Sequence, residues 1–394
     1  MTVKIVCDKN MPYAFEAFST IGDVTLIPGR DISRKDVRDA EVLVTRSTTN
    51  VNADLLEGSS VRFYGSAVIG VDHIDSDYLH KAGIEWAAAP GCNAVSVGNY
   101  VTAALLWLGE RYGFGLEGKT IGVIGVGNVG KQVCRFCRAM GMRVLANDPP
   151  RQRNTNDADA RDFVSLDTLL NESDFISCHV PLNKGGDDNT VHLIGAEQLA
   201  SMKDGVVLIN AARGAVVDNQ ALLDVIGKKV SHAVIDCWEG EPAYRADVMA
   251  KVDLGTPHIA GHAYEGKVNG TAMTYRAACE FMGVNATYPF ELPRPPVPVI
   301  RTDAAGRNDE DVLRDLVLEV YDIQADSDRL RSATEEDVRI NKTAFDSQRG
   351  TYPMRRQFDA TRVEIINSTD FLLKKIRGLD FKVEPRSCFQ PQPN

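Results

Sequence analysis

Short hydrophobic runs alternate with polar or amphipathic segments over residues 1–93. Runs such as VKIVC and AEVLVTRS have the length of buried strands, and the segments between them include SRKDVRDA and DSDYLHKAG. This alternation is typical of successive β-α units, whose strands lie parallel in one sheet. The pattern therefore predicts an α/β domain in this part of the chain.

A second alternating series begins at Lys119 and continues to about residue 260. Its hydrophobic runs KTIGVIG, RVLAND, FISCHVP, VVLINAA and HAVIDCW are separated by short polar connectors. Between the two series, residues 94–112 place hydrophobic side chains at helical spacing over a length that suits one long helix. We therefore predict a second α/β domain, with this helix at the crossing between the two.

The pattern changes again in the last third of the chain. A helix-like stretch over residues 265–283 leads into a segment with four prolines between Pro293 and Pro298. Because this many prolines break any regular element, the segment is predicted to be a linker or an extended arm. The remaining residues mix helical and strand patterns, which predicts a third, smaller unit.

Composition agrees with an ordinary globular protein. Of the 394 residues, 44% are hydrophobic and 25% are charged, and no apolar run approaches the roughly 20 residues of a membrane-spanning helix. The N-terminal sequence lacks the pattern of a secretory signal, and the eight cysteines are scattered through hydrophobic segments. Both features favour a cytoplasmic protein with reduced thiols. Cys134 and Cys137 form one C-x-x-C pair, which we interpret as helix packing because no second pair completes a zinc site.

The net charge bears on the class of partner. At a formal charge of −10, the chain is poorly suited to bind nucleic acid, because that affinity comes mainly from lysine and arginine at phosphates. We therefore expect a small-molecule partner, neither a nucleic acid nor a membrane.

A glycine motif lies between a strand pattern and a helix pattern. In GVIGVGNVG, Gly125, Gly127 and Gly130 have the G-x-G-x-x-G spacing, and the next strand-like run ends in Asp148. Such glycines permit a tight turn, a close approach of the backbone to a pyrophosphate and close helix packing, and the acidic residue binds the ribose diol. The unit therefore predicts a dinucleotide cofactor. Asp148 favours NAD, and the nearby Arg151 and Arg153 leave NADP as the alternative.

Three loops after strand patterns offer catalytic side chains. Arg213 follows VVLIN, where its guanidinium is suited to bind a carboxylate and stabilise charge on a substrate oxygen. His258 follows a proline after another strand and is suited to act as a base, and Glu241 is suited to hydrogen-bond its imidazole. Each residue also has a structural interpretation, as a solvated arginine, a packing histidine or part of a Glu-Pro turn.

These segments resemble the D-2-hydroxyacid dehydrogenases. GVIGVGNVG, HVPL, NAARGAVVD, the D-x-W-x-x-E-P string and PHIAG are similar to the motifs of that family and follow in its order. The resemblance implies that Arg213 binds and polarises the 2-oxo acid, that His258 transfers the hydroxyl proton and that Glu241 pairs with His258. It further implies cofactor contacts from the motif residues Asn128, Val129, Ala211, Asp236 and Gly261.

The family also implies how the chain is divided. Its members insert the cofactor domain between the two parts of the other α/β domain, so we expect a substrate-binding domain from residues 1–93 and 266–290. The NAD-binding Rossmann domain is then 94–265. The expected fold class is α/β, with two Rossmann-like or flavodoxin-like doubly wound domains, followed by a C-terminal α+β dimerisation domain over 291–394.

One branch of the family resembles this chain more closely. It acts on a phosphorylated 2-hydroxy acid and has a C-terminal extension that forms a homodimer, and FDSQRGTYPMRRQF and TRSTTNV are similar to its segments. This resemblance implies that Ser47 contacts the substrate, with Arg46 beside it as a partner for phosphate. Val68 and Val71 replace hydroxyl-bearing residues of the branch, and His262 stands where tyrosine is common, so these positions leave the recognition of the substrate open.

Two other functions remain open at this point. The chain is also compatible with a dehydrogenase of another D-2-hydroxy acid, such as phosphoglycerate, and with a dimeric NAD-sensing protein that has no activity. The presence of Arg213, Glu241 and His258 favours an enzyme, because a sensor needs no proton acceptor.

Overall fold

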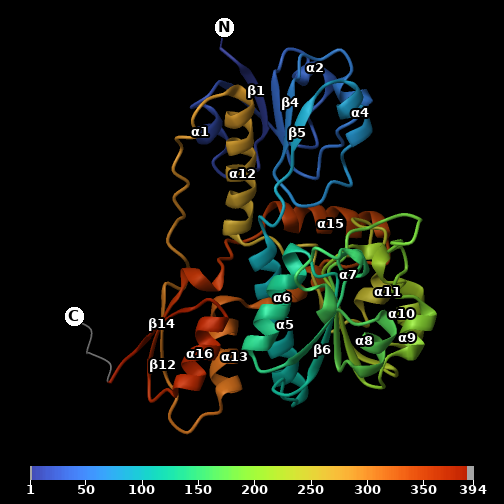
Figure 1. Ribbon diagram of the computed structural model, residues 1–394, viewed down its shortest axis with the longest axis vertical. Helices are drawn as coiled ribbons and strands as arrows, with labels where there is room; N and C mark the ends of the chain where they lie inside the picture. The colour runs from blue at the N-terminus through green and yellow to red at the C-terminus, as the bar shows by residue number, and fades with distance from the viewer. Residues whose placement is uncertain (1, 388–394) are drawn as a thin grey trace. The chain divides into compact units, whose positions relative to one another are not determined.

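A computed structural model describes residues 2–387 (Figure 1). The chain divides into two compact units, one of residues 1–93 and 263–293, the other of residues 94–262 and 294–394. The chain therefore passes from one unit to the other and back, as the family resemblance implies. The finer division into three domains stays a prediction.

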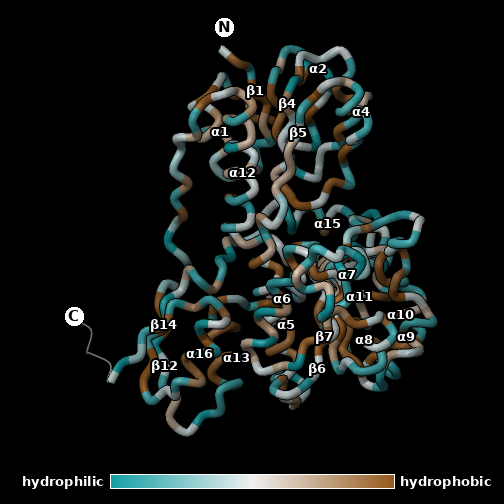
Figure 2. The backbone as a smooth tube through the Cα atoms, in the orientation of Figure 1, coloured by the Kyte–Doolittle hydropathy of each residue, from teal (hydrophilic) through white to brown (hydrophobic). Residues whose placement is uncertain are grey.

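The first unit is built on a five-stranded parallel sheet with the strand order β2-β1-β3-β4-β5. The strands are β1 (Lys4–Asp8), β2 (Asp23–Ile27), β3 (Val42–Thr45), β4 (Phe63–Ser66) and β5 (Glu85–Ala87). The helices are α1 (Ala14–Phe18), α2 (Arg34–Val37), α3 (Ala53–Leu56), α4 (Ser76–Lys81) and α12 (Tyr264–Met282). Figure 2 shows hydrophobic residues along β1 and β4, which matches the runs that predicted the strands. The order reverses beside β1, so the sheet is doubly wound.

The second unit contains a six-stranded parallel sheet with the order β11-β10-β9-β8-β6-β7. Its strands are β6 (Thr120–Ile124), β7 (Arg143–Asn147), β8 (Phe175–Cys178), β9 (Val206–Asn210), β10 (Val230–Ile235) and β11 (Leu254–Gly255). Its helices are α5 (Ala94–Tyr112), α6 (Asn128–Ala139), α7 (Pro149–Arg153), α8 (Leu166–Glu172), α9 (Ala196–Ser201), α10 (Asn219–Val225) and α11 (Ala246–Met249), with the 3-10 turns η1 (Ala160–Asp162) and η2 (Gly214–Val216).

Burial explains why this sheet forms. Every residue of β6, β8 and β9 is buried, as expected for parallel strands that are covered on both faces. The predicted long helix is α5, which packs against α6 at Gly98, where a Cβ would lie 2.6 Å from the ring of Phe136. The order reverses between β6 and β8, and ligands of such sheets bind at the carboxyl ends of the strands beside this point.

The C-terminal part of the second unit has its own three-stranded parallel sheet, in the order β12-β13-β14. The strands are β12 (Val299–Asp303), β13 (Arg362–Ile366) and β14 (Lys382–Pro385). The helices are α13 (Asp309–Val320), α14 (Ile323–Ser332), α15 (Val338–Gly350) and α16 (Asp370–Gly378), with the 3-10 turn η3 (Phe358–Ala360). The predicted class, two doubly wound α/β sheets and a separate C-terminal sheet with helices, is confirmed.

Shared packing joins this segment to the six-stranded sheet and its helices. One hydrophobic core runs from α5 and α6 into β12, α13 and α16. At its edge, Arg135 of α6 forms a bidentate ion pair with Asp380, and Lys375 of α16 lies 3.1 Å from Glu117. The C-terminal segment and the helices that cover the six-stranded sheet therefore share one hydrophobic core.

The cysteines behave as core residues. All seven cysteines within residues 2–387 are free and buried, and Cys388 lies outside the described residues. Cys134 and Cys137 lie in α6, as the packing interpretation predicts, and burial raises the pKa of Cys134 to about 11. Among the helices of the described residues, none combines the length and hydrophobicity that a membrane crossing requires.

Candidate active site

The glycine motif forms the turn between β6 and α6. Gly125 has a φ of 84°, and a Cβ there would lie 2.7 Å from Cγ1 of Val180, in the segment after β8. A Cβ on Gly130 would lie 2.0 Å from the carbonyl oxygen of Gly125. Around Gly127, by contrast, no described atom lies within 4 Å of such a Cβ. Two of the glycines are thus required by packing, and the third leaves the backbone open to a ligand.

The start of α6 and Asp148 frame this opening. Gly127 is the N-terminal cap of α6 and provides no side chain for the first amides of the helix, which are therefore suited to bind an anion. One oxygen of Asp148 accepts a hydrogen bond from the amide of Val126 at 2.8 Å, and the other accepts from the amide of Arg151 at 3.1 Å. The Asp148 carboxylate is thereby fixed at the end of β7, beside the glycine turn.

Both arginines that leave NADP as an alternative cofactor already form ion pairs. Arg151 binds Asp157 through two hydrogen bonds of 2.6 and 2.8 Å and Asp159 at 2.7 Å, and it also donates to the carbonyl of Val126. Since a 2′-phosphate would have to compete with two carboxylates, this arrangement favours NAD. Arg153 pairs with Asp188 on the surface.

These contacts lead to a prediction that separates packing from ligand binding. Gly130→Ala should lower the melting temperature by several degrees, because its Cβ collides with rigid backbone. Gly127→Ala should leave the melting temperature unchanged but weaken NAD binding by about tenfold or more, because the new methyl group occupies the ligand's side of the turn. Thermal unfolding and calorimetric titration with NAD measure the two effects. Equal losses of stability in both variants would contradict this division.

Arg213 lies in the loop after β9, and the buried amide of Asn210 holds this loop. The Nδ2 of Asn210 donates to the carbonyl of Arg213 at 3.0 Å and to that of Cys237 at 3.3 Å, which ties the loops after β9 and β10 together. Gly214 permits this approach, since a Cβ there would lie 1.9 Å from the carbonyl oxygen of Trp238. The guanidinium itself is partly exposed and donates to the carbonyl of Ala212 at 2.9 Å.

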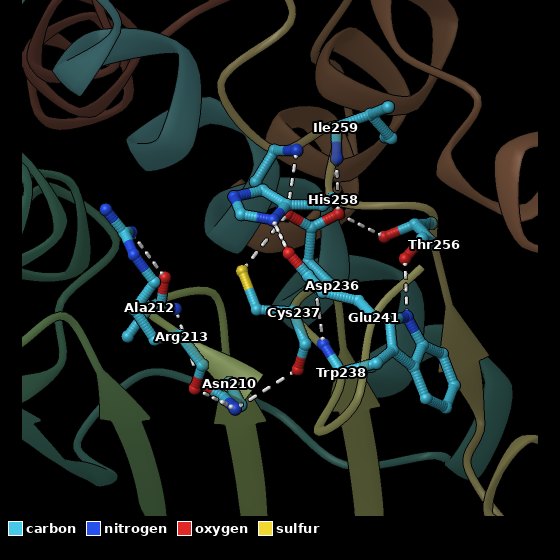
Figure 3. A network of polar contacts seen from close by, with 11 residues as sticks. Asn210, Ala212, Arg213, Asp236, Cys237, Trp238, Glu241, Thr256, His258 and Ile259 are labelled. Atoms are coloured by element: carbon cyan, nitrogen blue, oxygen red, sulfur yellow. Dashed lines mark hydrogen bonds and ion pairs between the residues drawn. The ribbon is translucent and has the colours of Figure 1, made fainter. Parts of the chain in front are cut away.

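Glu241 and His258 form a hydrogen-bonded pair. The Nδ1 of His258 lies 2.5 Å from Oε1 of Glu241, while the other carboxylate oxygen accepts from the amide of Trp238 at 2.9 Å. Figure 3 shows the second ring nitrogen of His258 on the side away from Glu241, and the Arg213 side chain above the carboxyl end of the neighbouring strand. The predicted cation, base and orienting carboxylate therefore come from three successive strand ends of one sheet.

The charge of Glu241 depends on its partners. Burial alone would raise the pKa of this carboxyl, but His258 and the Trp238 amide outweigh burial and hold it below its ordinary value. A carboxylate with a lowered pKa adds stability above its ordinary pKa, and this stability is lost as the pH falls through the lowered value.

We therefore expect Glu241→Gln to change the pH dependence of folding. The free energy of unfolding of the wild type should fall on acidification below about pH 4.5, more steeply than that of the variant, because only the wild type must protonate this carboxylate. Denaturant unfolding between neutral and acidic pH measures both slopes. Parallel curves would contradict the inferred ion pair.

Asp236 is buried beneath the loop of His258 and holds this loop by hydrogen bonds. It is 1% exposed, and its oxygens accept hydrogen bonds from the Thr256 hydroxyl at 2.7 Å and from the amides of Ile259 and Ala260 at 2.7 and 3.0 Å. Burial raises its pKa. Asp236 therefore holds the loop of His258, and its contact with the cofactor stays a prediction.

The remaining predicted residues belong to both units. Asn128, Val129 and Gly130 open α6, and Ala211 and Gly261 are partly buried in the loops of Arg213 and His258. His262 follows directly, with its ring 5.8 Å from that of Tyr352.

In the first unit, Arg46 is not an isolated cation. It forms an ion pair of 2.8 Å with the buried Asp8 at the end of β1. Ser47 is exposed and Val68 is half-buried. Arg46 is thus paired with an aspartate within the first unit, while the substrate contacts of these three residues stay predictions.

Comparison with known proteins assigns families to both parts of the second unit. Residues 97–260 match the family described as D-isomer specific 2-hydroxyacid dehydrogenase, NAD binding domain, and residues 292–376 match a domain of unknown function, DUF3410. The erythronate-4-phosphate dehydrogenase of Azotobacter vinelandii is 43% identical over 96% of this chain and 99% of that protein. That of Proteus mirabilis is 41% identical, with the same coverage.

Solved structures resemble about seven tenths of the chain. A D-lactate dehydrogenase from Aquifex aeolicus, solved with NAD and lactic acid, has a TM-score of 0.59 and 26% identity over 71% of this chain and 95% of that one. A 3-phosphoglycerate dehydrogenase from Entamoeba histolytica, solved with NAD, has a TM-score of 0.61 and 23% identity, covering 72% and 96%. The second likeness supports the fold alone.

Proposed function

The chain belongs to the D-2-hydroxyacid dehydrogenases and, within them, to the erythronate-4-phosphate dehydrogenases, and from this premise we propose that it oxidises 4-phospho-D-erythronate with NAD. The product is 2-oxo-3-hydroxy-4-phosphobutanoate, which belongs to the biosynthesis of pyridoxal 5′-phosphate. The observation that supports this reaction most directly is the Glu241–His258 pair, which lies with Arg213 at neighbouring strand ends of the sheet that also has the glycine turn (Figure 3).

The cofactor site fits NAD. The open backbone at Gly127 and the uncapped start of α6 would hold the pyrophosphate, and Asp148 would bind the ribose diol. Bound NAD supplies the acceptor for the hydride that leaves C2 of the substrate.

The side chains of the second unit divide the remaining work. Arg213 holds the substrate carboxylate and polarises the C2 oxygen. The Nε2 of His258, the ring nitrogen on the side away from Glu241 (Figure 3), accepts the proton of the C2 hydroxyl, while the C2–H bond breaks and the C2–O bond becomes a carbonyl. Glu241, hydrogen-bonded at Nδ1, fixes the ring and stabilises the imidazolium that forms.

Recognition of the phosphorylated end is assigned to the first unit and to His262. We propose that Ser47 and Arg46 contact the substrate, and that Val68 and His262 line its site. Because Arg46 shares its guanidinium with Asp8, it would contact phosphate only through the hydrogen-bonding capacity that this ion pair leaves.

We further propose that the protein is a homodimer formed through residues 291–394. Exposed hydrophobic side chains support an interface there, since Val338, Ile340, Met354 and Phe371 are 47%, 49%, 45% and 57% exposed. The reduced, buried cysteines of the described residues support a cytoplasmic location.

The proposal is tested with a panel of acids. The purified protein is incubated with NAD and 4-phospho-D-erythronate, 3-phosphoglycerate or D-lactate, and formation of NADH is measured. We expect the highest kcat/KM with 4-phospho-D-erythronate. A preference for another acid would overturn the substrate assignment, and binding of NAD without turnover of any acid would favour a sensor. Native mass spectrometry gives the oligomeric state, and a monomer would overturn the dimer.

A further inference from the structure

The loop that presents His258 is held from the outside by an arginine of the C-terminal segment. Arg355 lies between α15 and η3, and its Nη2 donates to the carbonyl of Ile259 at 3.1 Å and to that of Ala260 at 2.5 Å. The residue is 6% exposed. A buried guanidinium that binds two successive backbone carbonyls fixes their orientation.

The same two residues are held on their other side by Asp236. The amides of Ile259 and Ala260 donate to its carboxylate, and the amide of His258 donates to the Asp236 carbonyl at 2.8 Å. Both kinds of backbone group in Ile259 and Ala260 are therefore fixed. The Asp236 carboxylate binds the two amides, and the Arg355 guanidinium binds the two carbonyls. His258 comes directly before it with a φ of 53°, a left-handed conformation that a residue with a Cβ adopts only when its surroundings impose it.

Arg355 is itself firmly supported. Its guanidinium carbon lies 4.3 Å from the ring centre of Tyr321 and 5.8 Å from that of Tyr352. Both phenol groups donate to one oxygen of Asp326, at 2.9 and 2.6 Å. Burial alone would lower the pKa of Arg355, but these phenols and the nearby carboxylates, Tyr352 first, raise it above its ordinary value. The arginine thus stays charged inside the protein.

We propose that Arg355 is a positioning residue for catalysis, which reaches from the C-terminal segment to the His258 loop and holds the imidazole in the orientation that the reaction requires. The inference rests on the proposed role of His258 as the proton acceptor. Arg355 donates to the backbone carbonyls of Ile259 and Ala260, which follow His258 in the chain, so it acts on the imidazole only through this backbone. A displacement of about 1 Å at a reacting group can cost about 10²-fold in rate.

The test compares two arginines that anchor the C-terminal segment in the same manner. Arg331 of α14 donates to the carbonyls of Met249 and Val252, both at 2.8 Å, which precede β11 and lie at the opposite end of that strand from His258. Arg331→Lys is therefore the matched control for Arg355→Lys. Each lysine keeps the charge but loses the planar fork.

We expect Arg355→Lys to lower kcat by about 10- to 100-fold while the Kd for NAD changes by less than about twofold. Arg331→Lys should lower the melting temperature by about as much as Arg355→Lys does. It should leave kcat of the folded protein within about twofold of the wild type. Equal kcat values in the two variants would overturn the proposal and leave Arg355 a structural anchor.

A double variant provides the readout that a structural role would not move. Glu241 and Arg355 both orient His258, so the combined loss of kcat in Glu241→Gln/Arg355→Lys should be smaller than the product of the two single losses. Fully multiplicative losses would contradict the proposal. If Arg355→Lys does not fold, Tyr352→Phe takes its place, since it removes the Tyr352 hydroxyl from Asp326 and from Nη1 of Arg355. A smaller but still non-additive loss is then expected, and an additive one would overturn the inference.

Failure of this inference is distinguishable from failure of the proposed function. The kinetic comparison uses whichever 2-hydroxy acid the wild type oxidises best. Hydrogen exchange at the amides of Ile259 and Ala260 gives a readout without activity. It should accelerate in Arg355→Lys and not in Arg331→Lys, and unchanged exchange in both would show that Arg355 does not hold the loop.

Discussion

A His258→Gln variant is expected to lose about 10³-fold or more in kcat while it binds NAD as tightly as the wild type. Glutamine still offers a hydrogen-bonding group near Glu241, which is 2.5 Å from the imidazole in the wild type. Its amide, however, accepts no proton at neutral pH. Steady-state assays of NADH formation and calorimetric titration with NAD measure the two quantities separately.

The control is His232→Gln. His232 is partly exposed, and its Nδ1 lies 3.2 Å from Oδ1 of Asp253, which precedes β11, whereas His258 follows that strand. It should retain kcat within about twofold of the wild type. If His258→Gln kept near-normal turnover, the assigned proton acceptor would be wrong, and the interpretation of the Glu241–His258 pair would fail with it.

Arg213→Ala should lower kcat and raise the KM for the hydroxy acid, so that kcat/KM falls by about 10³-fold or more. Both parameters change because the guanidinium is proposed to bind the carboxylate in the ground state and to stabilise the C2 oxygen as the carbonyl forms. Removal of the side chain leaves the loop in place, since the amide of Asn210 holds the backbone carbonyl of Arg213. Assays over a range of substrate concentrations separate the two parameters.

Arg213→Lys distinguishes charge from geometry. A lysine restores a positive charge without the planar fork, so we expect recovery of part of the KM and little of kcat. Unchanged kcat and KM in Arg213→Ala would exclude this residue from the site, and full recovery with lysine would contradict a bidentate contact.

Much of the fold could be predicted because its central strands are buried on both faces. Runs such as VVLIN are apolar up to their last residue, so the pattern indicates a parallel sheet directly. The β6-α6-β7 unit was predictable for a second reason, since Gly125 and Gly130 are required by local backbone contacts that the motif records. The packing that covers the C-terminal sheet was not predictable, because the core that this sheet shares with α5 and α6 joins segments far apart in the sequence.

In the site, too, some features could be predicted from the sequence and others could not. Glu241 and His258 were predicted as a pair and lie in hydrogen-bonding contact. Asp236 was predicted from its motif as a cofactor contact, which stays a prediction, and the structure adds that its carboxylate accepts hydrogen bonds from the amides of Ile259 and Ala260 in the loop of His258. Arg355 was not predicted as part of the site, although TYPMRRQF was noted for its resemblance. No spacing in the sequence relates this arginine to PHIAG, since only the folded chain brings the two together.

Arg213 and His258 are proposed to act on the same carbon, C2 of 4-phospho-D-erythronate. Single-turnover reduction of NAD by this acid and by its form deuterated at C2 tests this role. We expect NADH from the ordinary acid and, more slowly, NADH deuterated at C4 from the deuterated acid, and neither acid should be oxidised at a comparable rate by His258→Gln or Arg213→Ala. Absence of NADH from this acid, with rapid oxidation of another hydroxy acid, would contradict it.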